Sequence, residues 1–294
     1  ACLDILKKSP FELCQIPGFG FRRVDAIVRK TDNRPRDPMR IRGALHCTLD
    51  EAKGKQGHLF LGREELRRAA FKMLNEKIPL PEMRVRPEEV EQELDAMILS
   101  GSVVSMRDSI YHPNAFAQED ETASRIARML VEERPPMKDI SSVIETVRAE
   151  QGLRTSGKQE SAVRTAFLYN LSVITGSPGT GKTTVLKIIL EVYRRIYPDG
   201  KIVLMAPTGR ASRRMAESTG FEEACTMHSG LGLVSEEDEG SRTKKQDSLD
   251  ADLVIVDEFS MVDMWLAGKF FSALKKGKSR ALCHPCPSQI HQTA

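Results

Sequence analysis

The sequence predicts a multidomain chain in which a helical first half precedes an α/β second half built on a parallel sheet. Three short apolar runs in the second half, LSVIT (171–175), KIVLMA (201–206) and ADLVIV (251–256), lack polar alternation. Such runs are expected for strands that are buried on both faces of a parallel sheet. A helical pattern from Lys182 to about Tyr197 separates the first two runs. Strands that alternate with helices in this way define the α/β class.

Short helical patterns fill the first half. Two short helices flank the turn Ile16–Gly20 and form a hairpin, and the second of them runs from about Phe21 to Arg29. Two longer patterns follow at about 41–53 and 63–75. The stretch EEVEQELDAMILSGSVVSMRDSIYH then predicts a helix, a Val-rich strand, a turn and another short strand. Helices followed by a small β-ribbon favour a winged-helix module.

Charge is nearly balanced, with 44 basic and 41 acidic residues and a formal net charge of +3. Affinity for a polyanion therefore has to come from local clustering. Such a cluster lies within residues 22–42, where eight basic residues stand against three acidic ones. On charge alone, a solvated helical face and a phosphate-binding surface both fit it. The basic residues are Arg22, Arg23, Arg29, Lys30, Arg34, Arg36, Arg40 and Arg42.

The six cysteines are scattered without the spacing of a disulfide framework, which favours a reducing, cytoplasmic compartment. No apolar run is long enough to span a membrane. Cys283 and Cys286 form a C-x-x-C pair near His284 and His291. A closed zinc site needs four arranged ligands, however, and no second pair follows. Zinc binding is therefore the less favoured interpretation of these residues.

A phosphate-binding loop is predicted between the first apolar run and the helix that follows it. The stretch GSPGTGKT matches G-x-x-x-x-G-K-[ST] and stands between a strand and a helix, which is the context this motif requires. Its glycines let backbone N–H groups face phosphate oxygens, Lys182 is expected to reach the β- and γ-phosphates, and Thr183 is expected to ligate Mg²⁺. The predicted ATP-binding residues are Gly176, Ser177, Pro178, Gly179, Thr180, Gly181, Lys182, Thr183 and Thr184.

Two carboxylates, Asp257 and Glu258, end the third apolar run. The carboxyl end of a strand is where an α/β sheet places ligand chemistry. Asp257 is expected to hold the Mg²⁺ shell, and Glu258 is expected to polarise an attacking water as general base. Lys182 and Glu258 are the predicted catalytic residues, so hydrolysis is favoured over nucleotide storage.

Four motifs in the second half resemble, in order and wording, the first motor domain of RecD-type superfamily 1 DNA helicases, which include the exodeoxyribonuclease V alpha subunit. They read SVITGSPGTGKTT, IVLMAPTGRASRRMAESTG, TMHSGLG and LDADLVIVDEFSMVDMWL, and the resemblance covers about residues 151 to 280. In the first half, IPGFGFRRVDAI resembles the helix-hairpin-helix of the same family. The resemblance implies a RecA-like P-loop ATPase that uses ATP and Mg²⁺ to move along single-stranded DNA in recombination or repair.

Further site residues follow from the resemblance alone. Gln159 is similar to the glutamine that recognises adenine upstream of the phosphate loop. Thr208, Gly209 and Arg210 resemble a motif that touches the DNA backbone, and Thr226 and His228 resemble the next DNA-side motif. In the hairpin, turn amides and adjacent basic residues are expected to hold DNA phosphates. The hairpin residues concerned are Gly18, Gly20, Arg22 and Arg23.

These patterns divide the chain into three expected parts. Residues 1–115 form a helix-hairpin-helix and winged-helix-like DNA-binding region, 116–150 a connecting helical segment, and 151–294 a first RecA-like domain that is truncated at its C-terminus. The opening ACLDILKKSPFEL reads like the middle of a helix, and the tail from about 278 departs from the family's next motif. We therefore expect a fragment of a longer product, with a truncated or frameshifted end.

The family's motors use arginine fingers from a second RecA-like domain, so slow hydrolysis is expected without one, because such a finger contributes about 10³- to 10⁵-fold in rate. Two other interpretations stay open at the sequence level. One is a DNA-binding protein that ATP only switches, and the other is a different P-loop ATPase such as a clamp or helicase loader.

Overall fold

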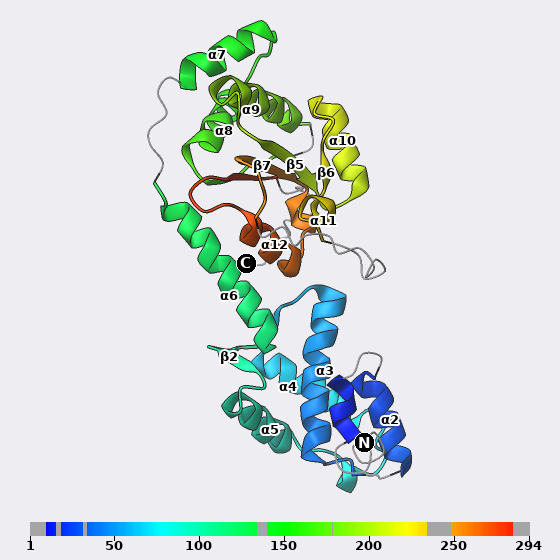
Figure 1. Cartoon of the computed structure of the whole chain (residues 1–294). Helices are drawn as coiled ribbons and strands as arrows, with labels where there is room; N and C mark the ends of the chain where they lie inside the picture. The colour runs from blue at the N-terminus through cyan, green and yellow to red at the C-terminus, as the bar shows by residue number, and fades with distance from the viewer. Residues whose placement is uncertain are drawn as a thin grey trace. The chain divides into compact units, whose positions relative to one another are not determined.

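A computed structural model describes residues 10–15, 19–31, 34–133, 140–177, 179–233 and 248–284. The chain divides into two compact units, residues 1–118 and 119–294 (Figure 1). The first unit is helical with a small antiparallel sheet, and the second is an α/β unit with a parallel sheet. The fold class predicted from the sequence is confirmed in both halves.

The first unit follows the element order of a winged helix after an N-terminal hairpin. A three-stranded antiparallel sheet of order β1-β3-β2 pairs Leu61 with Ile110, and Ser105 with Ile110 from the other side. The long connection between its first two strands holds two helices. In chain order the elements are η1 (Pro10–Gln15), α2 (Phe21–Thr31), α3 (Pro38–Gln56), β1 (Phe60–Gly62), α4 (Arg63–Asn75), η2 (Pro81–Met83), α5 (Pro87–Leu99), β2 (Val104–Met106) and β3 (Ser109–Tyr111).

Helix α3 is the central element of this unit. It begins where the Asp37 side chain accepts a hydrogen bond from the Met39 N–H, with Pro38 in the first turn, and ends at Gly57 in the left-handed conformation (φ 72°). Its buried face packs against α4, α5 and the hairpin helices. The fully buried Arg40 lies in that face, where its guanidinium bonds the Asp25 carboxylate and the carbonyls of Pro35 and Leu74. This pair ties the hairpin to α3.

The second unit is built around a five-stranded parallel sheet of order β4-β8-β7-β5-β6. Helix α6 (Pro113–Val131) leads into it. The further elements are α7 (Ile140–Glu150), α8 (Gly157–Leu168), β4 (Leu171–Val173), α9 (Lys182–Ile196), β5 (Ile202–Ala206), α10 (Gly209–Thr219), β6 (Cys225–Thr226), α11 (Met227–Gly230), β7 (Leu253–Asp257), η4 (Phe259–Met261), α12 (Met264–Ala273) and β8 (Arg280–His284).

Helices cover both faces of this sheet. On β7, Leu253 and Ile255 face a core shared with α7, α8 and α9, whereas Val254 and Val256 face a core shared with α12. Figure 1 shows α8 and α9 on one side of the strands and α12 on the other. Because both faces are buried, the strands show no polar alternation in the sequence, as expected.

Strand β8 was not expected from the sequence. Arg280 opens it and leaves only three apolar residues, so the pattern is too short and too polar to predict a central strand. In the structure Arg280 is 5% exposed, donates to the Tyr197 hydroxyl at 3.1 Å and lies over the rings of Tyr197 and Phe167. Five residues of the tail thus form a strand between β4 and β7. Residues 285–294 lie outside the described residues.

Candidate nucleotide site and DNA interface

The predicted phosphate-binding loop joins β4 to α9. Gly179 (φ 80°) and Gly181 (φ 78°) both adopt the left-handed conformation, which L side chains rarely take. At Gly176, an added Cβ would lie 2.7 Å from Thr180 Oγ1, and that hydroxyl donates to the Ser177 carbonyl at 2.8 Å. The turn therefore requires glycine at these three positions. Pro178 lies outside the described residues.

The Lys182 and Gln159 side chains both lie on this loop. Lys182 Nζ donates to the carbonyls of Gly176 at 2.7 Å and Ser177 at 3.3 Å. Gln159 Oε1 accepts from the Ser156 N–H, and its Nε2 donates to the Thr180 carbonyl at 2.9 Å. Gln159 thus connects the start of α8 to the loop. Its assignment to adenine stays a prediction.

A cavity of about 540 Å³ brings the loop and the predicted carboxylates together. Both Lys182 and Thr183 line it, as do Asp257 and Glu258 from the end of β7. Helix α10 forms another wall with the side chains of Arg214 and Ser218 among others. The full lining comprises Gly179, Gly181, Lys182, Thr183, Leu186, Ala211, Arg214, Met215, Ser218, Asp257, Glu258 and His284.

Two neighbours orient the Asp257 carboxylate at the end of β7. Burial of its carboxyl acts to raise the pKa, but the hydrogen bond and charge of His284, the Glu258 N–H and the Lys182 charge outweigh burial and hold the pKa of Asp257 below its ordinary value. Its Oδ1 lies 2.7 Å from His284 Nδ1 and accepts the Glu258 N–H at 2.9 Å. The carboxylate is therefore ionised and fixed in orientation.

Glu258 has a strained backbone. Its φ of 53° and ψ of 37° lie in the left-handed region, which only Arg107 shares among the described non-glycine residues. Residues in such conformations cost about 1 to 3 kcal/mol and gather at functional sites. The conformation turns the chain sharply after Asp257, so that the two adjacent carboxylates both line the cavity.

His284 lines the cavity, although no sequence pattern predicted it there. In the sheet β8 lies between β4 and β7, and His284 pairs in register with Asp257. The His284 side chain is 5% exposed, and its buried Nε2 finds no hydrogen-bond partner among the residues that the structure describes. Finding it would have required knowing that β8 enters the sheet beside β7. The alternative of a zinc site rested on the pair Cys283 and Cys286. Cys283 is buried in β8, and Cys286 lies outside the described residues.

Arg214 is a second lining residue that the motifs did not single out. It is an exposed cation on α10, in the stretch GRASRRM, where only the start of the helix was assigned a role. No ion pair or hydrogen bond of its side chain is found among the described residues. The sequence did contain a signal for Arg214. Helix α10 follows β5, the strand next to β7, and runs back along the cavity. Every third or fourth residue of such a helix faces the cavity.

The predicted DNA contacts after β5 and β6 come together at the carboxyl edge of the sheet. Thr208 caps α10 by accepting from the Ala211 N–H, and Thr226 caps α11 by accepting from the Ser229 N–H. A Cβ added to Gly209 would lie 4.0 Å from Thr226 Cγ2, so the two motifs touch. Arg210 and His228 are both exposed. The hydroxyls that were predicted for DNA are thus in use as helix caps.

The predicted hairpin contacts lie at the start of α2. Gly20 precedes this helix, Arg22 and Arg23 are exposed in its first turn, and Gly18 lies outside the described residues. Arg22 Nε bonds Glu51 at 2.7 Å. A phosphate that binds Arg22 would therefore have to replace this ion pair.

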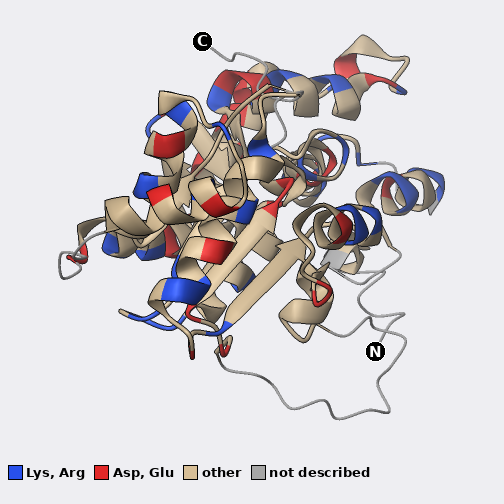
Figure 2. Cartoon of the chain, turned by 90° about the horizontal axis from the view of Figure 1, so that it is seen from above, with Lys and Arg blue, Asp and Glu red and all other residues tan. Residues whose placement is uncertain are grey.

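The basic cluster is less cationic than its sequence window suggested. At least five of its eight basic residues pair with carboxylates, and three of the acidic partners in these pairs come from outside the window because α3 and α5 fold against it. The pairs are Arg22–Glu51, Arg29–Asp25, Arg36–Glu89, Arg40–Asp25 and Arg42–Glu93. Figure 2 shows basic and acidic positions interspersed on the helices.

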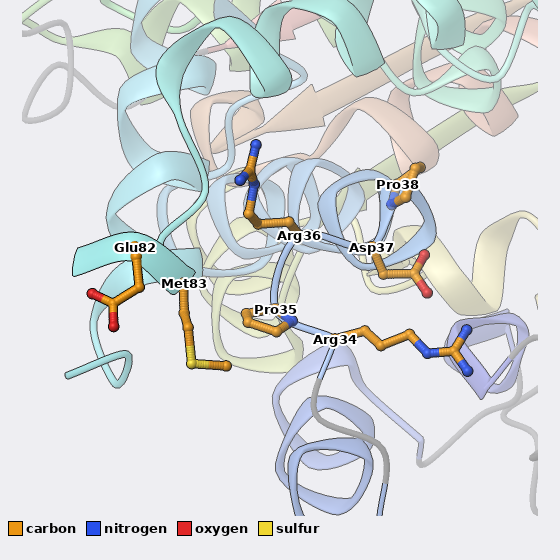
Figure 3. Close-up of a pocket in the computed structure, with 7 residues that line it drawn as sticks. All are labelled: Arg34, Pro35, Arg36, Asp37, Pro38, Glu82 and Met83. Carbon is orange, nitrogen blue, oxygen red and sulfur yellow. The ribbon is translucent and has the colours of Figure 1, made fainter. Parts of the chain in front are cut away.

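A hollow of about 500 Å³ also lies in the first unit, between the turn Arg34–Pro38 and η2 (Figure 3). Glu82 and Met83 line its other side. Because Arg36 is committed to Glu89 and both signs of charge line the hollow, its chemistry favours no particular ligand. None of the predicted site residues lines it.

Comparison with known proteins finds a family model for each half of the chain. The family model for the "ATP-dependent RecD2 DNA helicase HHH domain" matches residues 1–60, and a model described as "AAA domain" matches residues 159–283. The first agrees with the hairpin, and the second spans the sheet and its cavity. Together with the relatives below, these matches support a similarity to the N-terminal and first motor regions of RecD-type helicases. The recognition made from the four motifs is confirmed.

Named relatives agree with both matches. The ATP-dependent RecD2 DNA helicase of Deinococcus radiodurans is 29% identical over 283 residues, which is 94% of this chain and 38% of that protein. The RecBCD enzyme subunit RecD of Haemophilus influenzae is 37% identical over 139 residues, which is 40% of this chain and 21% of that protein. The chain thus spans well under half the length of these curated relatives.

Among solved structures, the UvsW helicase of bacteriophage T4 matches 45% of this chain and 52% of its own, with 12% identity and a TM-score of 0.36. A score this low carries no argument about fold or function. Of the described helices, none combines the length and the apolar character that a membrane span needs.

Proposed function

We propose that the chain is part of an ATP-dependent DNA helicase of the RecD type, to which it contributes a DNA-binding region (1–115), a connecting segment (116–150) and the first RecA-like ATPase domain (151–294). The proposed activity couples ATP binding and hydrolysis to movement on single-stranded DNA in recombination or repair. Four described cysteines, Cys14, Cys47, Cys225 and Cys283, form no disulfide, which supports a cytoplasmic setting.

Helix α10 carries this proposal. Its first turn holds Gly209 and Arg210, after the capping Thr208, and these are the residues that we assign to the DNA backbone. From the first turn to the third, Ala211, Arg214, Met215 and Ser218 line the cavity of the phosphate-binding loop. The side of α10 faces the nucleotide, and its N-terminal end faces DNA. A displacement of this rigid helix at one ligand therefore moves the residues that contact the other ligand.

The residues around the cavity fit a magnesium-bound nucleoside triphosphate. Thr183 and Asp257 offer a hydroxyl and an ionised carboxylate, and hard oxygen ligands are what Mg²⁺ prefers. Lys182 would exchange its bonds to the loop carbonyls for phosphate oxygens, and the N–H groups around Gly179 and Gly181 would face the same phosphates. Bound ATP supplies the phosphoanhydride whose hydrolysis releases free energy.

Glu258 is the proposed general base. Its carboxylate lines the cavity beside Asp257, and it would orient and deprotonate the attacking water. Replacement by glutamine keeps the size of the side chain and removes the base. Glu258→Gln is therefore expected to bind ATP with affinity near that of the wild type while it suppresses hydrolysis.

The test is thermodynamic linkage between the two ligands. The affinity of the chain for a labelled oligothymidylate is measured by fluorescence anisotropy with and without a non-hydrolysable ATP analogue and Mg²⁺. We expect the analogue to change the DNA affinity, by roughly 5- to 150-fold for a typical allosteric coupling. Lys182→Ala should remove the change, because it removes the nucleotide.

A matched pair of arginines isolates the role of α10. Arg210→Ala should weaken DNA binding and reduce the coupling, whereas Arg213→Ala, an exposed arginine on the same helix that does not line the cavity, should leave the coupling in place. Equal DNA affinity with and without the analogue in the wild type would contradict a coupled motor. Absence of any DNA binding by the wild type would favour a P-loop ATPase that does not act on DNA.

A further inference from the structure

A single tryptophan is exposed on the surface of the second unit. Trp265 is the only Trp of the chain and is 42% exposed. It stands on α12, whose opposite side buries Leu266, Phe270 and Phe271 against the sheet. Because Trp carries the largest apolar side chain, leaving Trp265 in water gives up the favourable free energy that its burial against the sheet would provide. Such exposure on an otherwise well-buried helix indicates a surface that is kept for a ligand.

Two further side chains complete this surface. The His228 ring lies 6.4 Å from the Trp265 ring, centroid to centroid, and Lys269 Nζ lies 5.8 Å from the Trp265 centroid, one helical turn along α12. His228 and Lys269 are both exposed. Aromatic rings beside a cation bind unpaired nucleotides well. The face of the base stacks on the ring, and the negatively charged phosphate is neutralised by the cation.

The position of this surface in the fold supports the same ligand. His228 follows β6 and Trp265 follows β7, so both lie at the carboxyl edge of the parallel sheet, where the phosphate-binding loop follows β4. Thr226, two residues before His228, touches Gly209 at the start of α10. Figure 1 shows α11 and α12 at the same end of the unit. The aromatic surface therefore continues the residues that we assigned to the DNA backbone.

We propose that Trp265, with His228 and Lys269, forms a stacking platform for an unpaired base of single-stranded DNA. This inference rests on the proposed function, because it names the residues that hold bases where Thr208 and Arg210 are assigned to the backbone. Stacking on a ring requires no hydrogen-bond readout, so the platform is tolerant of sequence. A base-paired duplex hides its base faces and would not use it.

Because Trp265 is the only tryptophan, intrinsic fluorescence of the whole chain reports this position alone. A short oligothymidylate is titrated against the chain, and an abasic deoxyribose-phosphate strand of equal length serves as the matched ligand. We expect oligothymidylate to quench the emission and the abasic strand to leave it nearly unchanged. Lys269→Gln should lower the log–log salt slope of oligothymidylate binding by up to about 0.7, the value for one phosphate on a single strand.

Variants are compared by anisotropy with a labelled oligothymidylate. Trp265→Ala should weaken binding about 5- to 150-fold, the range expected for the loss of one stacked base, and Trp265→Phe should restore most of it. Tyr169→Ala is the matched control, since Tyr169 is a 54% exposed aromatic that precedes β4 at the opposite, amino edge of the sheet. It should bind as the wild type does.

Each contrary outcome has a distinct meaning. Binding of oligothymidylate without quenching, together with wild-type affinity of Trp265→Ala, would overturn the platform and leave the proposed function standing. No binding of oligothymidylate by the wild type would overturn both. A shift of the Trp265 emission with protein concentration alone, accompanied by dimers in sedimentation, would assign the surface to a second copy of the chain and overturn the platform.

Discussion

Removing the His284 imidazole should weaken magnesium-dependent nucleotide binding while leaving magnesium-free binding nearly intact. His284 Nδ1 lies 2.7 Å from Asp257 Oδ1, and the pairing of β7 with β8 places the two residues side by side. Asp257 is the proposed magnesium ligand, and no role in holding phosphate is assigned to His284. The imidazole therefore acts through the orientation of the carboxylate, as a positioning residue.

The size of the effect follows from this geometry. A hydrogen bond to a charged group contributes about 1.5 to 3 kcal/mol, and the side chain of His284 is only 5% exposed, so water does not readily replace it. Losses of outer partners of metal ligands typically cost about 10- to 100-fold in metal affinity. We expect His284→Ala to lose affinity for the Mg²⁺ complex of ATP within that range.

The assay is calorimetric titration with ATP in the presence of Mg²⁺ and again with chelator. His284→Asn should recover part of the affinity, because its amide can donate to the carboxylate from a similar position. Cys283→Ala removes a buried side chain from the same strand, on the face that packs against the α12 core, and controls for destabilisation. An equal loss in Cys283→Ala and His284→Ala, or an equal loss with and without Mg²⁺, would refute the positioning role.

Three other predictions concern different parts of the molecule. Arg214→Gln should lower the affinity for ATP more than that for ADP, by about tenfold or more for a lost charge-assisted bond, and equal losses for both nucleotides in calorimetry would contradict a γ-phosphate contact. Arg40→Leu should lower the free energy of unfolding of the N-terminal unit by about 3 to 5 kcal/mol in urea titrations, because it leaves the buried Asp25 without its main partner, and a wild-type midpoint would refute this. The bonds from Arg22 and Lys55 lower the pKa of Glu51 to about 2. The contribution of these bonds to the free energy of unfolding is therefore complete above the ordinary pKa near 4.5, and it is lost as the pH falls from there toward 2. Urea titrations across that pH window should show a loss of under about 1 kcal/mol in the free energy of unfolding, because the Arg22–Glu51 pair is half exposed. The loss should be smaller in Arg22→Ala. An unchanged loss in that variant would contradict the assignment to this pair.

Local patterns were sufficient to predict the parts of the site that are contiguous in sequence. The phosphate-binding loop needs glycine where its backbone adopts the left-handed conformation, so the spacing of these glycines can be recognised in the sequence. The same holds for Asp257 and Glu258, because a carboxylate pair after an apolar run marks a strand end. Helix limits were also close, since α4 spans Arg63–Asn75, as its apolar spacing had indicated.

What the sequence could not predict depends on pairing between distant segments. His284 reaches Asp257 only because β8 inserts between β4 and β7, and no local pattern encodes that order. The acidic partners of the basic cluster could not be predicted for a similar reason, because Glu51, Glu89 and Glu93 reach it through the packing of α3 and α5. Trp265 lay inside a recognised motif, yet its exposure depends on which side of α12 meets the sheet.

The cavity at the carboxyl edge of the parallel sheet is proposed to bind a nucleoside triphosphate through Lys182. The decisive experiment is calorimetric titration of the wild type and of Lys182→Ala with a non-hydrolysable ATP analogue and Mg²⁺. We predict one site per chain for the wild type, and for Lys182→Ala a loss of affinity of at least about tenfold, the equivalent of about 1.4 kcal/mol, with an unchanged thermal unfolding midpoint. Equal affinity of the two proteins, or no heat of binding in the wild type, would contradict it.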